Sequence, residues 1–167
     1  TPQAQGFIPD GLEAMPESSL PPLGSVEFVV RTQRRTKRGP AIELAQAITA
    51  PGDVVIVPNP SYPIHAFGFL MAGGMIRSVP SEPTPQFFEA VERAIIHSIP
   101  KPIALIVCYP SNPTAYVADL DFYKDLVAFA KKHDIFILSD LAYAEVYFDE
   151  DKPPPSVLQD RKSTRLN

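Results

Sequence analysis

The stretch IALIVCYPSNPTAYVADLDFYKDLVAFAKKHDIFILSD, from Ile103 to Asp140, decides the fold of this chain. It opens on an apolar run, Ile103–Tyr109, which is typical of a strand buried on both faces. A turn rich in proline ends that run, and an amphipathic segment over 119–134 follows, with Asp119 as its expected N-cap. Ile135–Asp140 then predicts a second buried strand. The stretch therefore predicts a strand, a helix and a strand in succession.

The same alternation of strand and helix occurs nearer the N-terminus. Short apolar runs predict strands, and apolar residues spaced near 3.6 predict helices. Thr84 is expected to cap one helix, with Pro85 at its first position, and two glycines are expected to stop another. The expected strands are 54–57 and 75–79, and the expected helices are 41–50, 64–74 and 84–98. This order predicts an α/β fold with a mostly parallel sheet and alternating helices.

Composition and charge exclude several classes of protein. The chain has 167 residues, of which 45% are hydrophobic, enough for a packed core. Its net charge of -4 argues against nucleic acid as a partner. No apolar run reaches the ~18 residues that a membrane span needs, and the N-terminus does not read as a signal peptide. One cysteine excludes an internal disulfide framework, so a soluble cytoplasmic protein is expected.

Three segments are expected from the pattern. Residues 1–39 are rich in proline and then basic; the basic run predicts a solvated surface, with an anion contact as the alternative. Residues 40–159 carry the strand and helix alternation. Residues 160–167, DRKSTRLN, have no apolar pattern and read codon by codon as a sequencing-adapter string, so we expect them to be read-through rather than part of the domain.

Three loops follow predicted strands, where ligands bind in parallel sheets. Asp140 ends an apolar strand, and a carboxylate in that setting either has a charged or hydrogen-bonded partner or caps the next turn. Asn112 either forms a turn with the following proline or directs its amide at a ligand oxygen. Tyr62 is either a half-buried loop aromatic or a ring that stacks on a flat ligand. Tyr143, three residues after Asp140, adds a phenol.

Together, the motifs NPSYP, SNPT and DLAY, in this order, resemble the fold-type I pyridoxal-phosphate aminotransferases of class I/II, the aspartate, alanine and LL-diaminopimelate aminotransferase group. The resemblance covers about residues 40–148. It implies that Asp140 pairs with the pyridine nitrogen of pyridoxal 5'-phosphate and that Asn112 and Tyr143 donate to its ring oxygen. It also implies that Tyr62 stacks on the ring. The implied substrates are an amino acid and a 2-oxo acid, and the full-length protein is expected to be a homodimer.

The sequence departs from that family in four ways. The catalytic lysine is expected some dozens of residues after DLAY, and no lysine of this chain stands in a matching motif, so we expect the chain by itself to be inactive. The substrate-binding arginine is also absent. Only TKRG, at 36–39, approaches the phosphate-binding turn, offset by one residue. Ala115 replaces the usual glycine after Asn-Pro-Thr, a mild change unless the backbone there needs a positive φ.

Other expectations complete the prediction. The resemblance implies cis peptide bonds at Asn59–Pro60 and Asn112–Pro113. The three histidines lie at no metal-ligand spacing, so no metal site is predicted, and Cys108 is expected to be an inert buried residue. A lyase or decarboxylase of the same fold remains an alternative. So does the aminotransferase-like sensing domain of a transcription regulator; a plain nucleotide binder would need a glycine-rich phosphate loop that does not follow these strands.

Overall fold

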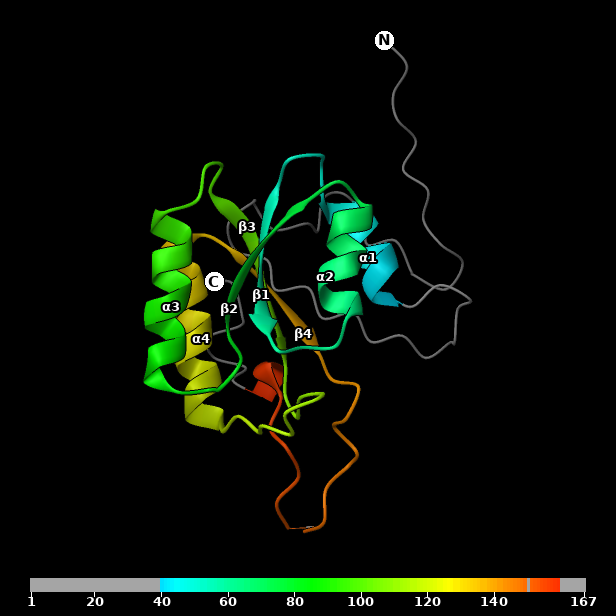
Figure 1. Ribbon diagram of the computed structural model, residues 1–167. Helices are drawn as coiled ribbons and strands as arrows, with labels where there is room; N and C mark the ends of the chain where they lie inside the picture. Colours follow the sequence, from blue (N-terminus) through cyan, green and yellow to red (C-terminus); the bar gives the residue numbers. More distant parts are fainter. Residues whose placement is uncertain (1–39, 150, 160–167) are drawn as a thin grey trace, which may run out of the picture.

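The computed structural model describes residues 40–149 and 151–159, and these residues form the predicted α/β layer (Figure 1). The four strands form one parallel sheet in the order β2-β1-β3-β4. Every predicted strand and helix between residues 40 and 140 is present. Their bounds are α1 Pro40–Ile48, β1 Val54–Asn59, α2 Ile64–Met71, β2 Met75–Pro80, α3 Pro85–Ile96, β3 Pro102–Cys108, α4 Leu120–His133, β4 Phe136–Asp140 and the short 3-10 helix η2 Val157–Gln159.

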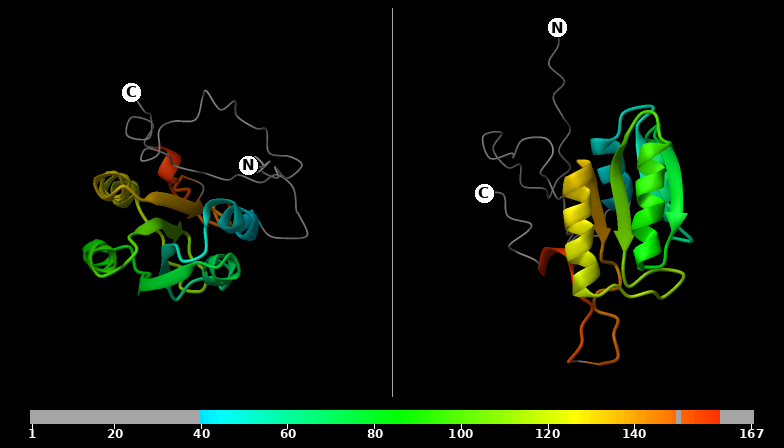
Figure 2. Two further views of the ribbon diagram at one scale, coloured as in Figure 1. Left: turned by 90° about the horizontal axis from the view of Figure 1, so that it is seen from above. Right: turned by 90° about the vertical axis from the view of Figure 1, so that its left-hand side faces the viewer.

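Helices cover both faces of the sheet. Helices α1 and α2 lie on one face, and α3 and α4 lie on the other (Figures 1 and 2). Successive side chains of a strand point to opposite faces of the sheet, so each central strand contributes side chains to two cores, one on each face. On β3, Leu105 and Val107 pack on the side of α3 and α4, whereas Ala104 and Ile106 pack on the side of α1 and α2. This arrangement explains why the strands read as continuous apolar runs rather than as alternating ones.

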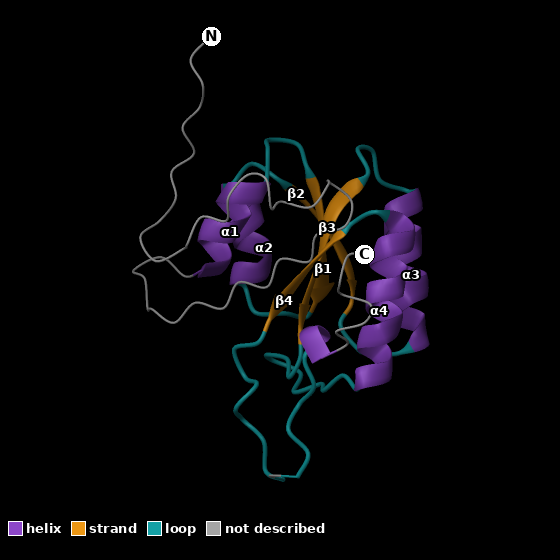
Figure 3. Ribbon diagram, turned by 180° about the vertical axis from the view of Figure 1, so that it is seen from behind, coloured by secondary structure: helices purple, strands orange, loops and turns teal. Residues whose placement is uncertain are grey.

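The largest core lies between the sheet and helices α3 and α4. Leu105 and Phe87 are fully buried in it, and burying such a side chain contributes about 1.5–3 kcal/mol. Val157 of η2 is also fully buried in this core, so residues after the long loop return to pack beside α4. The segment 141–149 lies between β4 and that return, and it extends away from the sheet (Figure 3).

The helix ends confirm most of the expected signals. The Asp119 carboxylate accepts a hydrogen bond from the Phe122 backbone N–H at 2.7 Å, as expected of an N-cap. Gly73 has a φ of 88°, which lets the chain leave α2. Thr84 does occupy the N-cap position of α3, with Pro85 next, but its side chain makes no capping hydrogen bond. The sequence therefore predicted the N-cap position correctly, but Thr84 does not form the capping hydrogen bond.

Two peptide bonds were predicted to be cis, and both are. Asn59–Pro60 and Asn112–Pro113 are cis, and so are Ile99–Pro100 and Tyr109–Pro110, which were not predicted. β1 extends two residues beyond its apolar run, because Pro58 and Asn59 pair with Val79 and Pro80 of β2.

The predicted segments 1–39 and 160–167, with the basic run and the TKRG turn, lie outside the described residues. Within the described residues, no helix is long and apolar enough to cross a membrane.

Candidate functional site

The candidate site lies at the carboxyl ends of three adjacent strands. β1, β3 and β4 are neighbours in the sheet and run in the same direction, so the loops that follow them meet at one edge. Those loops carry the four predicted residues: Tyr62 after β1, Asn112 after β3, and Asp140 with Tyr143 at the end of β4. The fold therefore gathers residues that lie up to 81 positions apart in the sequence.

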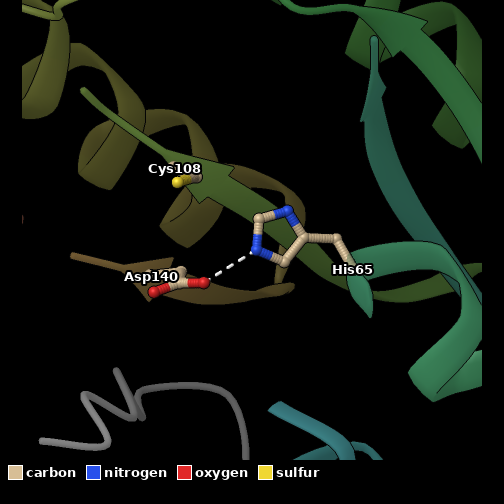
Figure 4. A group of neighbouring side chains, drawn as sticks. All are labelled: His65, Cys108 and Asp140. Carbon is tan, nitrogen blue, oxygen red and sulfur yellow. Dashed lines mark hydrogen bonds and ion pairs between the residues drawn. The ribbon is translucent and has the colours of Figure 1, made fainter. Parts of the chain in front are cut away.

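Asp140 has the partner that its apolar setting required. Its Oδ2 lies 2.8 Å from Nε2 of His65, which is on the first turn of α2 (Figure 4). Its other oxygen, Oδ1, accepts a hydrogen bond from the Ala142 backbone N–H at 3.2 Å. Asp140 therefore has a hydrogen-bonded partner through Oδ2 and caps the next turn through Oδ1, so both interpretations of this residue apply. With 35% of the side chain exposed, the carboxylate keeps a side that a ligand could reach.

His65 is the residue that sequence reasoning missed. It is only 2% exposed, and its second ring nitrogen, Nδ1, has no hydrogen-bond partner among the described residues. The signal that could have found it is its position three residues after Tyr62, on the helix that starts beside the site. A buried imidazole that hydrogen-bonds a carboxylate fixes the orientation of that carboxylate.

Asn112 and Tyr143 also come together, as the motifs implied. The Asn112 side-chain amide donates to the Tyr143 hydroxyl at 2.7 Å, across 31 residues of sequence. Since the hydroxyl oxygen accepts this bond, its own proton remains to be donated elsewhere. The pair therefore presents a fixed O–H donor at the same sheet edge as Asp140.

The turn that carries Asn112 is held by its own backbone. The Ala115 N–H donates to the Ser111 carbonyl at 2.9 Å, and the Ser111 N–H donates to the Tyr116 carbonyl at 3.0 Å. The Ser111 and Thr114 hydroxyls also hydrogen-bond to each other. Ala115 has a φ of 57°, so the backbone does need the left-handed conformation in which a glycine was expected. The departure at Ala115 is therefore more than a mild change.

Tyr62 lies at the open side of the site. Its ring meets the His65 ring edge to face, with centroids 6.2 Å apart and an angle of 77° between the planes. Because 48% of Tyr62 is exposed, a ring face is free for another flat group. This exposure is compatible with both interpretations of Tyr62, the half-buried loop aromatic and the ring that stacks on a flat ligand.

Cys108, at the end of β3, is buried as predicted. Its thiol donates to the Pro110 carbonyl, with sulfur and oxygen 3.6 Å apart. Burial, and after it the negative charge of Asp140, raises the pKa of the Cys108 thiol from 9.0 to about 12. The thiol is therefore protonated at neutral pH and a poor nucleophile.

The fold brings three potential metal ligands together. The sequence spacing of histidine and cysteine predicted no metal site, and that stays a prediction, but ligand atoms of His65, Cys108 and Asp140 all lie within 4.8 Å of one another. Spacing along the chain could not indicate this cluster, because its members come from α2, β3 and β4.

The geometry suits a flat ring with a positive N–H on one edge and a negative oxygen on another. Asp140 offers a carboxylate to the first, and the Tyr143 hydroxyl, held by Asn112, offers a proton to the second. A nearby cavity of about 10 Å³, lined in part by His65 and Asn112, is too small to hold a ring. The donor set therefore fits a pyridoxal ring.

Comparison with known proteins decides the family. Residues 39–164 match the family described as Aminotransferase class I and II. The chain belongs to this family. It is 74% identical over 116 residues to the putative aminotransferase AatC of Rhizobium meliloti, a match that covers 70% of this chain and 28% of that protein. It is 49% identical over 108 residues to the glutamate-pyruvate aminotransferase AlaC of Escherichia coli, which covers 65% of this chain and 26% of that protein.

Solved structures agree with the sequence comparison. A Thermus thermophilus aspartate aminotransferase mutant matches with a TM-score of 0.62 and 31% identity, over 72% of this chain and 31% of that one. The chain thus spans less than a third of the length of the relatives it matches. Members of this family depend on pyridoxal phosphate.

Proposed function

We propose that the protein containing this chain is an aminotransferase, which moves an amino group between an amino acid and a 2-oxo acid, and that this chain supplies part of its cofactor site. The observation that carries the proposal is the hydrogen bond between Asn112 and Tyr143 beside the Asp140–His65 pair, at one sheet edge. Pyridoxal phosphate, when bound, supplies an electron sink for the substrate's α-carbon.

In this proposal, Asp140 keeps a proton on the pyridine nitrogen. A carboxylate favours the positive form of a nearby nitrogen, because opposite charges stabilise each other where water is partly excluded. His65 acts through Asp140: a hydrogen bond from Nε2 fixes the position of Oδ2. The two residues then act as one anchored negative charge.

Asn112 and Tyr143 would act at the ring oxygen. The Tyr143 hydroxyl would donate to the ring oxygen, and the Asn112 amide orients that hydroxyl by donating to its oxygen. Tyr62, with its exposed ring, stacks on one face. These contacts orient the ring in its plane and cover one side of it.

The chain does not supply every part of the reaction. None of the described lysines stands in a motif like that of the family's catalytic lysine, and the ion pairs that Lys132 and Lys152 make are with Glu92 and Asp149, away from the four site residues. We therefore expect the chain to bind the cofactor without turning over substrate. Transamination by the purified chain would contradict this expectation.

The homodimer and the compartment are part of the same proposal. On α2, Phe67, Leu70 and Met71 leave about half or more of their surface exposed, at 58%, 48% and 59%. Neighbouring apolar side chains on one helix are typical of a surface that another part of the protein or a second copy covers. A single free cysteine suits the reducing cytoplasm.

The relatives favour an aminotransferase over the alternatives. The Rhizobium, Escherichia and Thermus proteins are all named as aminotransferases. No feature of the described site specifically favours a lyase, a decarboxylase or a regulator's sensing domain.

Binding of pyridoxamine 5'-phosphate to the chain tests the proposal. This probe has the ring nitrogen, ring oxygen and phosphate of the cofactor but no aldehyde that surface lysines could trap. We expect saturable binding in a titration that follows the probe's fluorescence. Asp140→Asn should weaken it about tenfold or more, since a hydrogen bond to a charged group contributes about 1.5–3 kcal/mol.

A matched substitution provides the control. Asp121→Asn removes the same charge from an exposed position on α4, where the carboxylate pairs with Lys124, and should leave binding unchanged. Asn112→Ala should weaken binding through the loss of Tyr143 orientation. Equal effects of Asp140→Asn and Asp121→Asn would show that binding follows net charge alone, and the proposed site would be wrong.

A further inference from the structure

Three side chains of different chemistry converge below the candidate cofactor site. His65 comes from α2, Cys108 from the end of β3 and Asp140 from the end of β4, and one ligand-type atom of each lies within 4.8 Å of the other two (Figure 4). His65 and Cys108 are almost fully buried, whereas Asp140 is partly exposed. Their directions are set by the helix and two strands rather than by a loose surface loop.

The hydrogen bond between His65 and Asp140 explains two of these residues without any metal. Cys108 is the third, and it takes no part in that bond: its thiol donates a long hydrogen bond to the Pro110 carbonyl, and its sulfur interacts with the Asn112 backbone. An imidazole nitrogen, a sulfur and a carboxylate oxygen are the ligands that zinc takes in proteins. A zinc site with three protein ligands keeps its fourth position for water.

We propose that His65, Cys108 and Asp140 bind one zinc-like divalent cation when no pyridine ring occupies Asp140. Bond lengths of about 2.0–2.3 Å in a tetrahedral site place ligand atoms roughly 3.5 Å apart, so metal binding requires atoms as far apart as 4.8 Å to approach and the His65 and Asp140 atoms, 2.8 Å apart, to separate slightly. His65 and Cys108, but not Asp140, line a cavity of about 10 Å³, so there is room for one small atom or ion on one side of the cluster.

The charges of such a site balance. The thiol loses its proton to the solvent as sulfur bonds to the cation, because a coordinating thiol is deprotonated. The thiolate and the carboxylate then carry two negative charges against the two positive charges of the ion, and the imidazole is neutral. A buried site with no net charge avoids the cost of an isolated buried ion.

Exclusion between cation and cofactor rests on the proposed function, since both would use the Asp140 carboxylate. The cation would remove the charge that holds the pyridine nitrogen, so a metal-loaded chain should bind the cofactor poorly. The site would thereby make cofactor loading sensitive to free zinc-like ions.

Cobalt(II) is the probe that tests the site, because a cobalt–thiolate bond gives a near-ultraviolet charge-transfer band. The purified chain, free of cofactor and kept reduced without thiols, is titrated with Co²⁺. We expect a band that saturates at one ion per chain. Cys108→Ser should abolish it, and His65→Gln should weaken binding at least about tenfold, the effect that loss of even an outer-shell metal partner commonly has.

Control variants separate this site from general metal binding. His97→Gln changes an exposed histidine at the end of α3 and should leave the band unchanged. Far-ultraviolet circular dichroism must match the parent chain in each variant; if Cys108→Ser is not folded, Cys108→Ala replaces it. A Co²⁺ titration without the band, or a band that survives in the Cys108 variant, overturns the proposal.

Pyridoxamine 5'-phosphate then tests exclusion. A saturating concentration should reduce the Co²⁺ band, and a band that stays unchanged overturns the exclusion. Binding of the same probe to the metal-free chain tests the proposed function by itself, so failure of one proposal is distinguishable from failure of the other.

Discussion

Replacing Ala115 by glycine should stabilise this protein, although glycine usually destabilises. Ala115 has a φ of 57°, in the turn that presents Asn112 to the candidate site. In that left-handed conformation the alanine Cβ crowds the backbone carbonyl, at a cost of about 1–2 kcal/mol. The substitution Ala115→Gly removes this strain and leaves the backbone hydrogen bonds of the turn in place.

The magnitude follows from two opposing effects. Glycine adds freedom to the unfolded chain, which costs about 0.5–1 kcal/mol at a position without strain. Subtracting this cost from the strain leaves a net stabilisation of about 0–1.5 kcal/mol, with a central value of about 0.8 kcal/mol. For a chain of this size, the melting temperature should rise by about 1–4 °C.

Urea unfolding followed by far-ultraviolet circular dichroism measures the effect, with an unchanged dependence on urea expected. Ala72→Gly is the matched control: Ala72 has a φ of -79°, so glycine relieves no strain there and should destabilise by about 0.5–1 kcal/mol. Gly52→Ala is the reverse change. Gly52 has a φ of 92° and open space around an added Cβ, so only backbone strain should destabilise it. Loss of stability in Ala115→Gly equal to that in Ala72→Gly would refute the reasoning.

Three further predictions concern the cap, the core and the buried thiol. Asp119→Ala should cost about 1 kcal/mol in urea unfolding, and Thr84→Ala less, because Thr84 makes no capping hydrogen bond. Leu105→Ala should cost about 2–5 kcal/mol in the same assay, since Leu105 is fully buried; a cost below 1 kcal/mol would contradict the core assignment. Because the pKa of Cys108 is about 12 in the folded chain and 9.0 is its ordinary value, the unfolded chain loses this proton first as pH rises. Stability should therefore fall between about pH 9 and pH 12, and Cys108→Ala should flatten that fall; an unchanged slope would show that other groups cause it.

The sequence determined the order and type of the elements, because these depend on neighbours close in the chain. The apolar run Ile103–Tyr109 has the continuous pattern of a strand covered on both faces, and α4 has the amphipathic spacing of a helix that covers one. Asp119 was predictable as a cap since its hydrogen bond reaches only three residues. The motifs also placed Asn112 and Tyr143 at strand ends, where the order of strands then brought them together.

Only the tertiary structure decided what each of these residues touches. The sequence showed that Asp140 needed a partner but could not select His65, which lies 75 residues away and reaches it because β1 and β4 flank β3. The same packing brings Cys108 within reach of both, a cluster that no spacing along the chain could indicate. The local sequence pattern shows which positions of a strand or helix are buried. Contacts between distant residues depend instead on strand order and register, which are settled only when the whole sheet packs.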